Sequence, residues 1–128
     1  MAKGDFIIIE SPFAGEVQRN IRYARACVKD CLLREEVPYA SHLFFTQRGV
    51  LDDRIPEERI LGMNAGIFIA RFASLEGVYT DLGISAGMEW GIRAAEKAGR
   101  RIEFRLLGDD WEQKYFEQAA RFPNMGEF

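Results

Sequence analysis

Histidine and cysteine, the residues that build most metal and redox sites, are scarce in this sequence of 128 residues. His42 is the single histidine, and Cys27 and Cys31 are the only cysteines. Their spacing puts both cysteines on one face of a predicted helix, which favours two small buried apolar groups over a metal site. A zinc site needs further ligands of these kinds, so we expect neither a metal nor a cofactor.

Long apolar runs and an excess of basic residues are also missing. No segment approaches the roughly 18 consecutive apolar residues of a membrane span, and the apolar run at 6–9 is too short and too early for a signal peptide. The net charge of −3 provides no basic field for a nucleic acid. We therefore expect a cytoplasmic protein, of a cell or of a virus acting inside one, with neither a membrane nor a nucleic-acid polymer as partner.

The composition is that of an ordinary globular protein, with 48% hydrophobic and 29% charged residues. A chain of this length can bury an independent core, and it shows no internal repeat or interdomain linker. The sequence therefore predicts one domain over 1–128, with a core at 6–107 and a helical tail at 109–122.

Short apolar runs alternate with helical patterns along the core. Strands are expected at 6–9, 37–40, 77–80 and 102–107, and helices at 17–34, 56–72 and 85–98. This alternation predicts an α/β, Rossmann-like fold: a mostly parallel sheet of four to five strands flanked by helices, plus a C-terminal helix. The aromatic stripe of the tail either packs on the core or covers another subunit.

The most informative stretch is 78–89, where an apolar run ends in an acid, small residues follow and a helical pattern begins. A strand, a tight turn and a helix start place backbone N–H groups before an anionic or polyhydroxy ligand. In an open α/β sheet such a turn lies at the carboxyl end of a strand, where ligands bind. The stretch contributes the candidate ligand residues Asp81, Gly83, Ser85, Gly87 and Met88.

Five motifs together resemble a known family. They are, in order, Ile9–Gly15, Arg19–Ile21, Ser41–Leu43, Pro56–Arg59 and Asp81–Met88. The chain is similar over about 6–107 to small phage and bacterial proteins of the nucleoside 2-deoxyribosyltransferase-like superfamily. That superfamily includes deoxynucleoside-monophosphate N-glycosidases and the nucleotide-binding lonely-guy-like proteins.

The resemblance implies a nucleotide-type small molecule as ligand, with the turn at Ser11 contacting its sugar or phosphate. It also implies a homodimer or larger homo-oligomer with shared active sites. Its ligand helix normally begins Gly-(Thr, Met or Val)-x-x-Glu, where the glutamate is the nucleophile. Counted from Gly87, that position is Gly91 here, and the nearby carboxylate of Glu89 lies about 200° away around the helix.

Each candidate in this stretch also has an ordinary structural explanation. Glu89 is either a solvent-facing acid in the first helical turn or a substitute nucleophile or ligand contact. Asp81 is either a turn residue or a functional acid. Ser85 is expected to cap the helix, a role that is compatible with contact to a ligand phosphate.

The remaining candidates come from the first half of the chain. His42 has an unperturbed pKa near neutrality, and its strand end should open onto the same cleft as Ser11 and Asp81. Asn20 is either a solvated helix residue or a ligand contact. Phe13 and Met88 are candidates for packing against a base, with core packing as the alternative.

Two functions follow from these candidates. The first is capture of a nucleotide or nucleotide-derived molecule without turnover, which fits a cleft without its nucleophile. A phage-encoded version would sequester a nucleotide defence signal in the host cytoplasm. The alternative is a nucleotide N-glycosidase or deoxyribosyltransferase that uses Glu89 as nucleophile, with Asp81 or His42 assisting. We expect the binding role.

Overall fold

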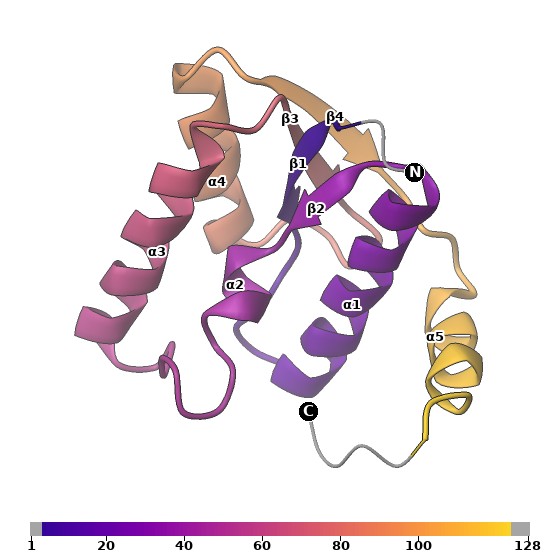
Figure 1. Ribbon diagram of the computed structural model, residues 1–128. Coiled ribbons are helices and arrows are strands. Elements are labelled where there is room, and N and C mark those ends of the chain that lie inside the picture. The colour runs from indigo at the N-terminus through magenta and orange to yellow at the C-terminus, as the bar shows by residue number, and fades with distance from the viewer. Residues whose placement is uncertain (1–3, 124–128) are drawn as a thin grey trace.

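The computed structural model describes residues 4–123 as one sheet surrounded by helices (Figure 1). The strands are β1 (Phe6–Glu10), β2 (Val37–Tyr39), β3 (Leu75–Tyr79) and β4 (Arg101–Arg105). The helices are α1 (Val17–Leu33), α2 (Ser41–Phe44), α3 (Pro56–Ala70), α4 (Ala86–Lys97) and α5 (Trp111–Ala119). Within the described residues, no helix has the length and apolar character needed to cross a membrane.

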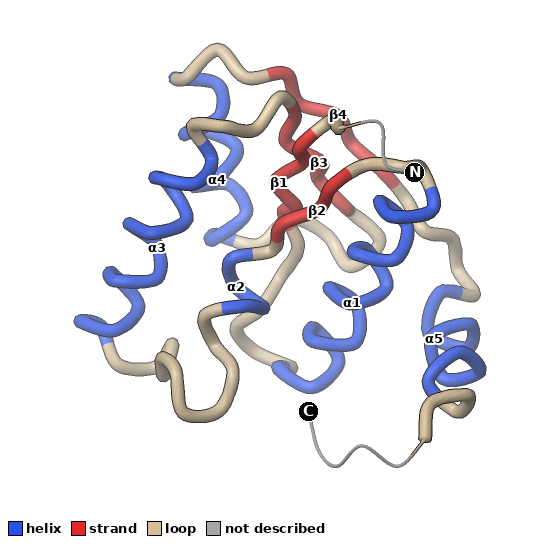
Figure 2. The backbone as a smooth tube through the Cα atoms, in the orientation of Figure 1, coloured by secondary structure: helices blue, strands red, loops and turns tan. Residues whose placement is uncertain are grey.

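The sheet has four strands in the order β2-β1-β3-β4, and every pair is parallel. Figure 2 shows the strands together in the centre with helices on both sides. In the two pairings of β1, Ile7 lies opposite Pro38 of β2, and Ile9 lies opposite Gly77 of β3. The expected α/β, Rossmann-like fold with a C-terminal helix is confirmed.

Two helices cover each face of the sheet. Because side chains alternate along a strand, Ile7 and Ile9 point to one face, where they join a core with Tyr23 of α1 and Trp111 of α5. Glu10 points to the other face, where it lies against Gly91 of α4. Figure 1 shows α1 and α5 on one side and α3 and α4 on the other.

Cys27 and Cys31 are free and fully buried in the α1 core, as predicted from their spacing. Burial raises the pKa of the Cys27 thiol, and it raises the pKa of Cys31 to about 11. Both thiols are therefore protonated at neutral pH, which makes them unreactive packing groups.

The structure shifts strand boundaries by one or two residues and adds a helix; β4, for example, ends at Arg105 and not at 107. β3 begins two residues earlier than expected, because the buried carboxylate of Glu76 is paired with Arg100 and so tolerated in a strand. β2 ends at Tyr39, one residue early, and the short helix α2 follows it. A helix of four residues is too short to leave a periodic pattern in the sequence.

The tail helix packs on its own chain. The rings of Tyr23 and Trp111 are 5.0 Å apart between centroids, in an edge-to-face arrangement. Arg22 Nη2 lies 2.9 Å from Glu112 Oε2, which ties α5 to α1 a second time. Trp111 of the aromatic stripe thus packs on the core, whereas Phe116 remains 53% exposed.

Candidate functional site

The strand order has one topological switch point, between β1 and β3. The chain passes from β1 outward to β2, then returns to the other side of β1 to form β3. In open α/β sheets, ligands bind outside the carboxyl ends of the strands at such a point. Since Glu10 lies opposite Val78 in the register, the loops that follow β1 and β3 leave the sheet side by side.

Ser11 and His42 meet at this edge. Ser11 follows β1, His42 follows β2, and Ser11 Oγ lies 2.7 Å from His42 Nε2. The ring of Phe13 meets the imidazole edge-on at 6.5 Å between centroids. Burial lowers the pKa of His42 to about 4, so its imidazole is neutral at pH 7 and offers one donor and one acceptor nitrogen.

Asn20 holds the loop that carries Phe13. Its side-chain nitrogen donates hydrogen bonds to the carbonyl oxygens of Phe13, at 2.9 Å, and Ala14, at 3.1 Å. The residue is 6% exposed and lies in the first turn of α1. Asn20 is thus placed to shape the loop, and its amide nitrogen is already used in doing so.

The start of α4 forms the other wall of the edge. Ser85 caps the helix as expected, because its Oγ accepts a hydrogen bond from the backbone N–H of Met88 at 3.3 Å. Gly83 has φ +86°, a left-handed conformation that suits glycine, and its N–H donates to Thr80 O at 3.0 Å. Gly87 is exposed, whereas Met88 is buried in the core. The exposed helix start is suited to anionic or polyhydroxy groups.

Asp81 joins the ends of three elements. Its carboxylate accepts hydrogen bonds from the Tyr23 hydroxyl at 2.6 Å and from the backbone N–H groups of Leu107 and Gly108, at 2.9 and 3.0 Å. Burial opposes ionisation, but these hydrogen bonds outweigh it, so the pKa of Asp81 lies below its usual value. The structure therefore gives Asp81 internal partners on α1 and after β4.

Glu10 fills the space beside Gly91. An ideal Cβ built at Gly91 would lie 2.2 Å from Glu10 Oε2 and 2.5 Å from Oε1. Only a glycine leaves room for that carboxyl group at this point of α4. Glu89 is exposed on the helix, while Gly91 is buried against the sheet. Position 91 thus faces a carboxyl group that comes from β1, not from the helix.

A second carboxylate lies next to Glu10. Burial raises the pKa of Glu10 well above its usual value, and a hydrogen bond with Glu76 raises it further. Glu76 is 1% exposed and accepts a hydrogen bond from Arg100 Nε at 2.7 Å. Arg100 also donates to the carbonyl oxygen of Ala70 at 2.9 Å. The arrangement fits a neutral Glu10 carboxyl beside an ionised Glu76 that is paired with Arg100.

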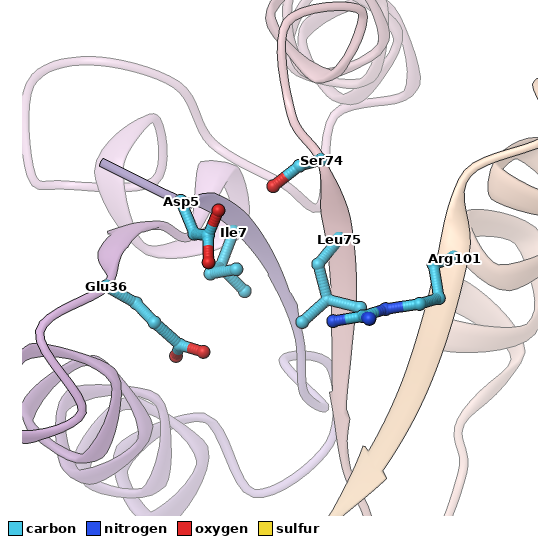
Figure 3. A pocket seen from close by; sticks show the side chains of 6 residues that line it. All are labelled: Asp5, Ile7, Glu36, Ser74, Leu75 and Arg101. Atoms are coloured by element: carbon cyan, nitrogen blue, oxygen red, sulfur yellow. The ribbon is translucent and has the colours of Figure 1, made fainter. Parts of the chain in front are cut away.

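Two pockets can be compared with the carboxyl edge of the sheet as ligand sites. A pocket of about 290 Å³ lies at the amino ends of the strands, opposite the switch point (Figure 3). It is lined by Asp5, Ile7, Glu36, Ser74, Leu75 and Arg101. Glu36 is engaged there by two hydrogen bonds from Arg105, at 2.7 and 2.8 Å. Its position and the engaged carboxylate argue against this pocket as the main ligand site.

The second pocket, of about 80 Å³, opens beside His42 between α2 and α3. Arg59 lines it together with two acids, Asp53 and Glu58. The carboxylate of Glu58 already accepts a hydrogen bond from the backbone N–H of Asp52 at 2.9 Å. This small pocket therefore extends the Ser11–His42 edge toward a cation on α3.

Sequence reasoning missed Glu10 and Glu76 as members of this site. Glu10 lay within the motif Ile9–Gly15 but was not singled out as a site residue, and Glu76 fell outside the expected strand. A signal was available in the glycine at position 91, where the resemblance implies a carboxylate. It did not indicate which distant residue fills the space.

Comparison with known proteins places most of the chain in a described family. The model of a family described as "Domain of unknown function (DUF7768)" matches residues 5–105, from just before β1 to the end of β4. No curated protein and no solved structure matches the chain.

Proposed function

The chain belongs to the DUF7768 family, and from its site we propose that it binds a nucleotide or nucleotide-derived small molecule at the carboxyl edge of the sheet. The observation that carries this proposal is the hydrogen-bonded pair of Ser11 and His42 at the topological switch point. The site would be completed by the exposed start of α4, which leaves the neighbouring strand at the same edge.

The chemistry of these groups suits such a ligand. Backbone N–H groups at the start of α4 favour a phosphate. The Ser11 hydroxyl and the neutral His42 imidazole can donate to and accept from sugar hydroxyls. The ring of Phe13, which meets the imidazole at this edge, offers an apolar surface for a base. Arg59 in the adjoining pocket supplies a positive charge for a second anionic group.

Binding without turnover agrees with where the carboxyl groups lie. Glu89 is exposed on α4 and is separated by about 200° from the helix position at which the resemblance implies a nucleophile. Glu10 is near that position, but burial favours its protonated form. A protonated carboxyl group is a poor nucleophile, although it can donate a hydrogen bond to a ligand.

A second candidate function is hydrolysis of an N-glycosidic bond. The observation in its favour is the Glu10 carboxyl group beside Gly91. A neutral carboxyl can act as a general acid: it would protonate the departing base while the C–N bond breaks. Water would then add to the anomeric carbon and give its proton to the resulting Glu10 carboxylate. This role would use Glu10, not Glu89.

The test begins with the protein purified from cells and examined by native mass spectrometry for a carried nucleotide. Titration calorimetry with nucleoside monophosphates then measures affinity. We expect Gly87→Trp to abolish binding by filling the edge, and Ser11→Ala to weaken it about tenfold. Gly87→Ala is the matched control, because the nearest atom to its new Cβ would be Ser85 Oγ at 3.9 Å. Glu89→Gln should leave affinity within a few-fold.

Assay of free base separates the two functions. Release of base by the wild-type protein, stopped by Glu10→Gln, would establish the hydrolase, and its loss in Glu89→Gln would assign that role to Glu89. Absence of binding to any nucleoside monophosphate at millimolar concentration, together with no carried ligand, would overturn both.

A further inference from the structure

Helix α3 carries an exposed apolar face. Ile60, Leu61, Ile67 and Phe68 are between 42 and 60% exposed. At 100° per residue they lie on one side of the helix, with Asn64 between them. The opposite side holds Gly62 and Gly66, which approach Leu51 and Ser41, and the buried Ala70. We call the four apolar residues and Asn64 the α3 face.

Within residues 4–123, no other segment covers the α3 face. Figure 1 shows α3 at the rim of the molecule, on the side away from α1 and α5. Phe72, just past the helix end, extends the exposed apolar surface at 62% exposure. Contiguous apolar surface of this kind marks interaction sites in soluble proteins.

We propose that the α3 face packs antiparallel against the α3 face of a second copy of this chain, about a two-fold axis at Asn64. An isologous interface requires a surface complementary to itself. The α3 face meets this condition, because Asn64 lies midway between Ile60 and Phe68 and midway between Leu61 and Ile67. Each apolar residue therefore meets an apolar residue of the partner at the same height.

The charges at the two ends of α3 agree with an antiparallel pair. Asn64 is also midway between Glu57, in the first turn, and Arg71, at the C-terminal cap. Antiparallel packing brings Glu57 of each copy to Arg71 of the other, whereas parallel packing would bring like charges together. The Arg71 guanidinium is held over the rings of Phe68 and Phe72, at 5.0 and 5.9 Å, and so beside the proposed seam.

Asn64 would fix the register of the pair. At the two-fold axis the Asn64 amide of one chain faces the Asn64 amide of the other. Each amide can therefore donate one hydrogen bond to the other and accept one from it. A polar residue in the middle of an apolar helix seam costs stability but selects one alignment. A shift by one turn in either direction would bury the amide against apolar side chains.

The first test is the mass of the protein in solution, measured by light scattering on a sizing column. We expect twice the chain mass of 14.6 kDa at micromolar concentration. Phe68→Glu should raise the dimer dissociation constant at least a hundredfold. Phe116→Glu is the matched control, since Phe116 is a similarly exposed phenylalanine on α5. A monomeric wild-type protein, or dissociation by Phe116→Glu alone, would overturn the proposal.

Cysteine cross-linking tests the direction of the helices. The native Cys27 and Cys31 are fully buried, so introduced thiols can be oxidised selectively. Asn64→Cys should form a covalent dimer under mild oxidation. Glu57→Cys should not, because the two copies of position 57 would be about 21 Å apart along the helices. The double variant Glu57→Cys with Arg71→Cys should form a cross-link between position 57 of one chain and position 71 of the other. Efficient cross-linking by Glu57→Cys alone would contradict an antiparallel pair.

Charge exchange provides an independent check. Glu57→Arg alone should weaken the dimer about tenfold, since it places two cations together at each end of the seam. The double variant Glu57→Arg with Arg71→Glu should recover most of that loss. A double variant that is as weak as the sum of the single changes would show that these residues do not meet. This inference does not depend on the proposed ligand.

Discussion

Glu10 occupies the space in which a side chain at Gly91 would begin, with its Oε2 only 2.2 Å from an ideal Cβ at that position. The two residues are 81 positions apart in the sequence and belong to β1 and α4. Their contact links the carboxyl end of β1 to the helix that follows the switch point. The identity of either residue therefore constrains the other.

The first prediction is a strong energetic coupling between these two positions. In the wild-type background, Gly91→Ala should be neutral or destabilising, because the new methyl group displaces the buried Glu10 carboxyl. In a Glu10→Ala background it should stabilise the protein by about 1 kcal/mol, the usual gain of alanine over glycine within a helix. Urea denaturation of the wild type, the two single variants and the double variant measures the coupling energy in a double-mutant cycle. Additive effects would show that the contact has no energetic consequence.

The second prediction concerns the pH dependence of stability. The pKa of Glu10 is raised in the folded protein, so the folded state holds a proton that the unfolded state begins to lose near pH 4.5. The contribution of Glu10 to the free energy of unfolding is therefore complete below about pH 4.5 and lost as pH rises toward the folded pKa, with a slope of up to about 1.4 kcal/mol per pH unit.

Glu10→Gln keeps the shape of the neutral carboxyl and cannot ionise. Its free energy of unfolding, relative to wild type, should thus increase as pH rises from 4.5. Glu89→Gln, at an exposed carboxylate on α4, is the matched control and should follow the wild-type curve. A Glu10→Gln curve parallel to wild type across pH 4.5–8 would contradict a raised pKa.

Most of the fold could be predicted because its strands leave simple patterns. β1 is covered on both faces, so Phe6–Ile9 is a continuous apolar run bounded by polar residues. β3 was predicted to begin two residues too late, because Glu76 interrupts its apolar character. Glu76 is acceptable there only because Arg100, 24 residues later, pairs with it. A local pattern cannot contain a partner at that distance.

The site could be predicted where topology alone decides it. Parallel strands bring their carboxyl ends to one edge, so Ser11 and His42 were expected to share a cleft, and they lie 2.7 Å apart. The partners of Asp81 could not be predicted in the same way, because its carboxylate accepts hydrogen bonds from a tyrosine of α1 and from backbone N–H groups beyond β4. Such contacts depend on how helices pack on the sheet.

The third prediction concerns the ion pair of Arg100 and Glu76, whose side chains are 9 and 2% exposed. Arg100→Met should destabilise the protein by about 3–5 kcal/mol, because it leaves a buried carboxylate without its cation. Adding Glu76→Gln should recover part of the loss by removing that charge. Arg93→Met, at an exposed position on α4, is the control and should change stability by less than about 0.5 kcal/mol. Equal stability of both arginine variants in urea would contradict the prediction.

The last prediction distinguishes the two explanations of Asp81. If its internal hydrogen bonds are its main role, Asp81→Asn should cost about 2–3 kcal/mol, because an amide N–H2 would then face the backbone donors of Leu107 and Gly108. Tyr23→Phe, which removes one of these partners, should cost about 1–2 kcal/mol.

The pH dependence of the Asp81 variant has a defined sign. The pKa of Asp81 is lowered in the folded protein, so its stabilisation is present above about pH 3.8 and is lost as pH falls through the folded pKa. The difference between Asp81→Asn and wild type should shrink accordingly in acid. If Asp81→Asn instead leaves stability unchanged but abolishes nucleotide binding, the carboxylate contacts the ligand. Because its oxygens already receive hydrogen bonds from Tyr23, Leu107 and Gly108, we expect the loss of stability.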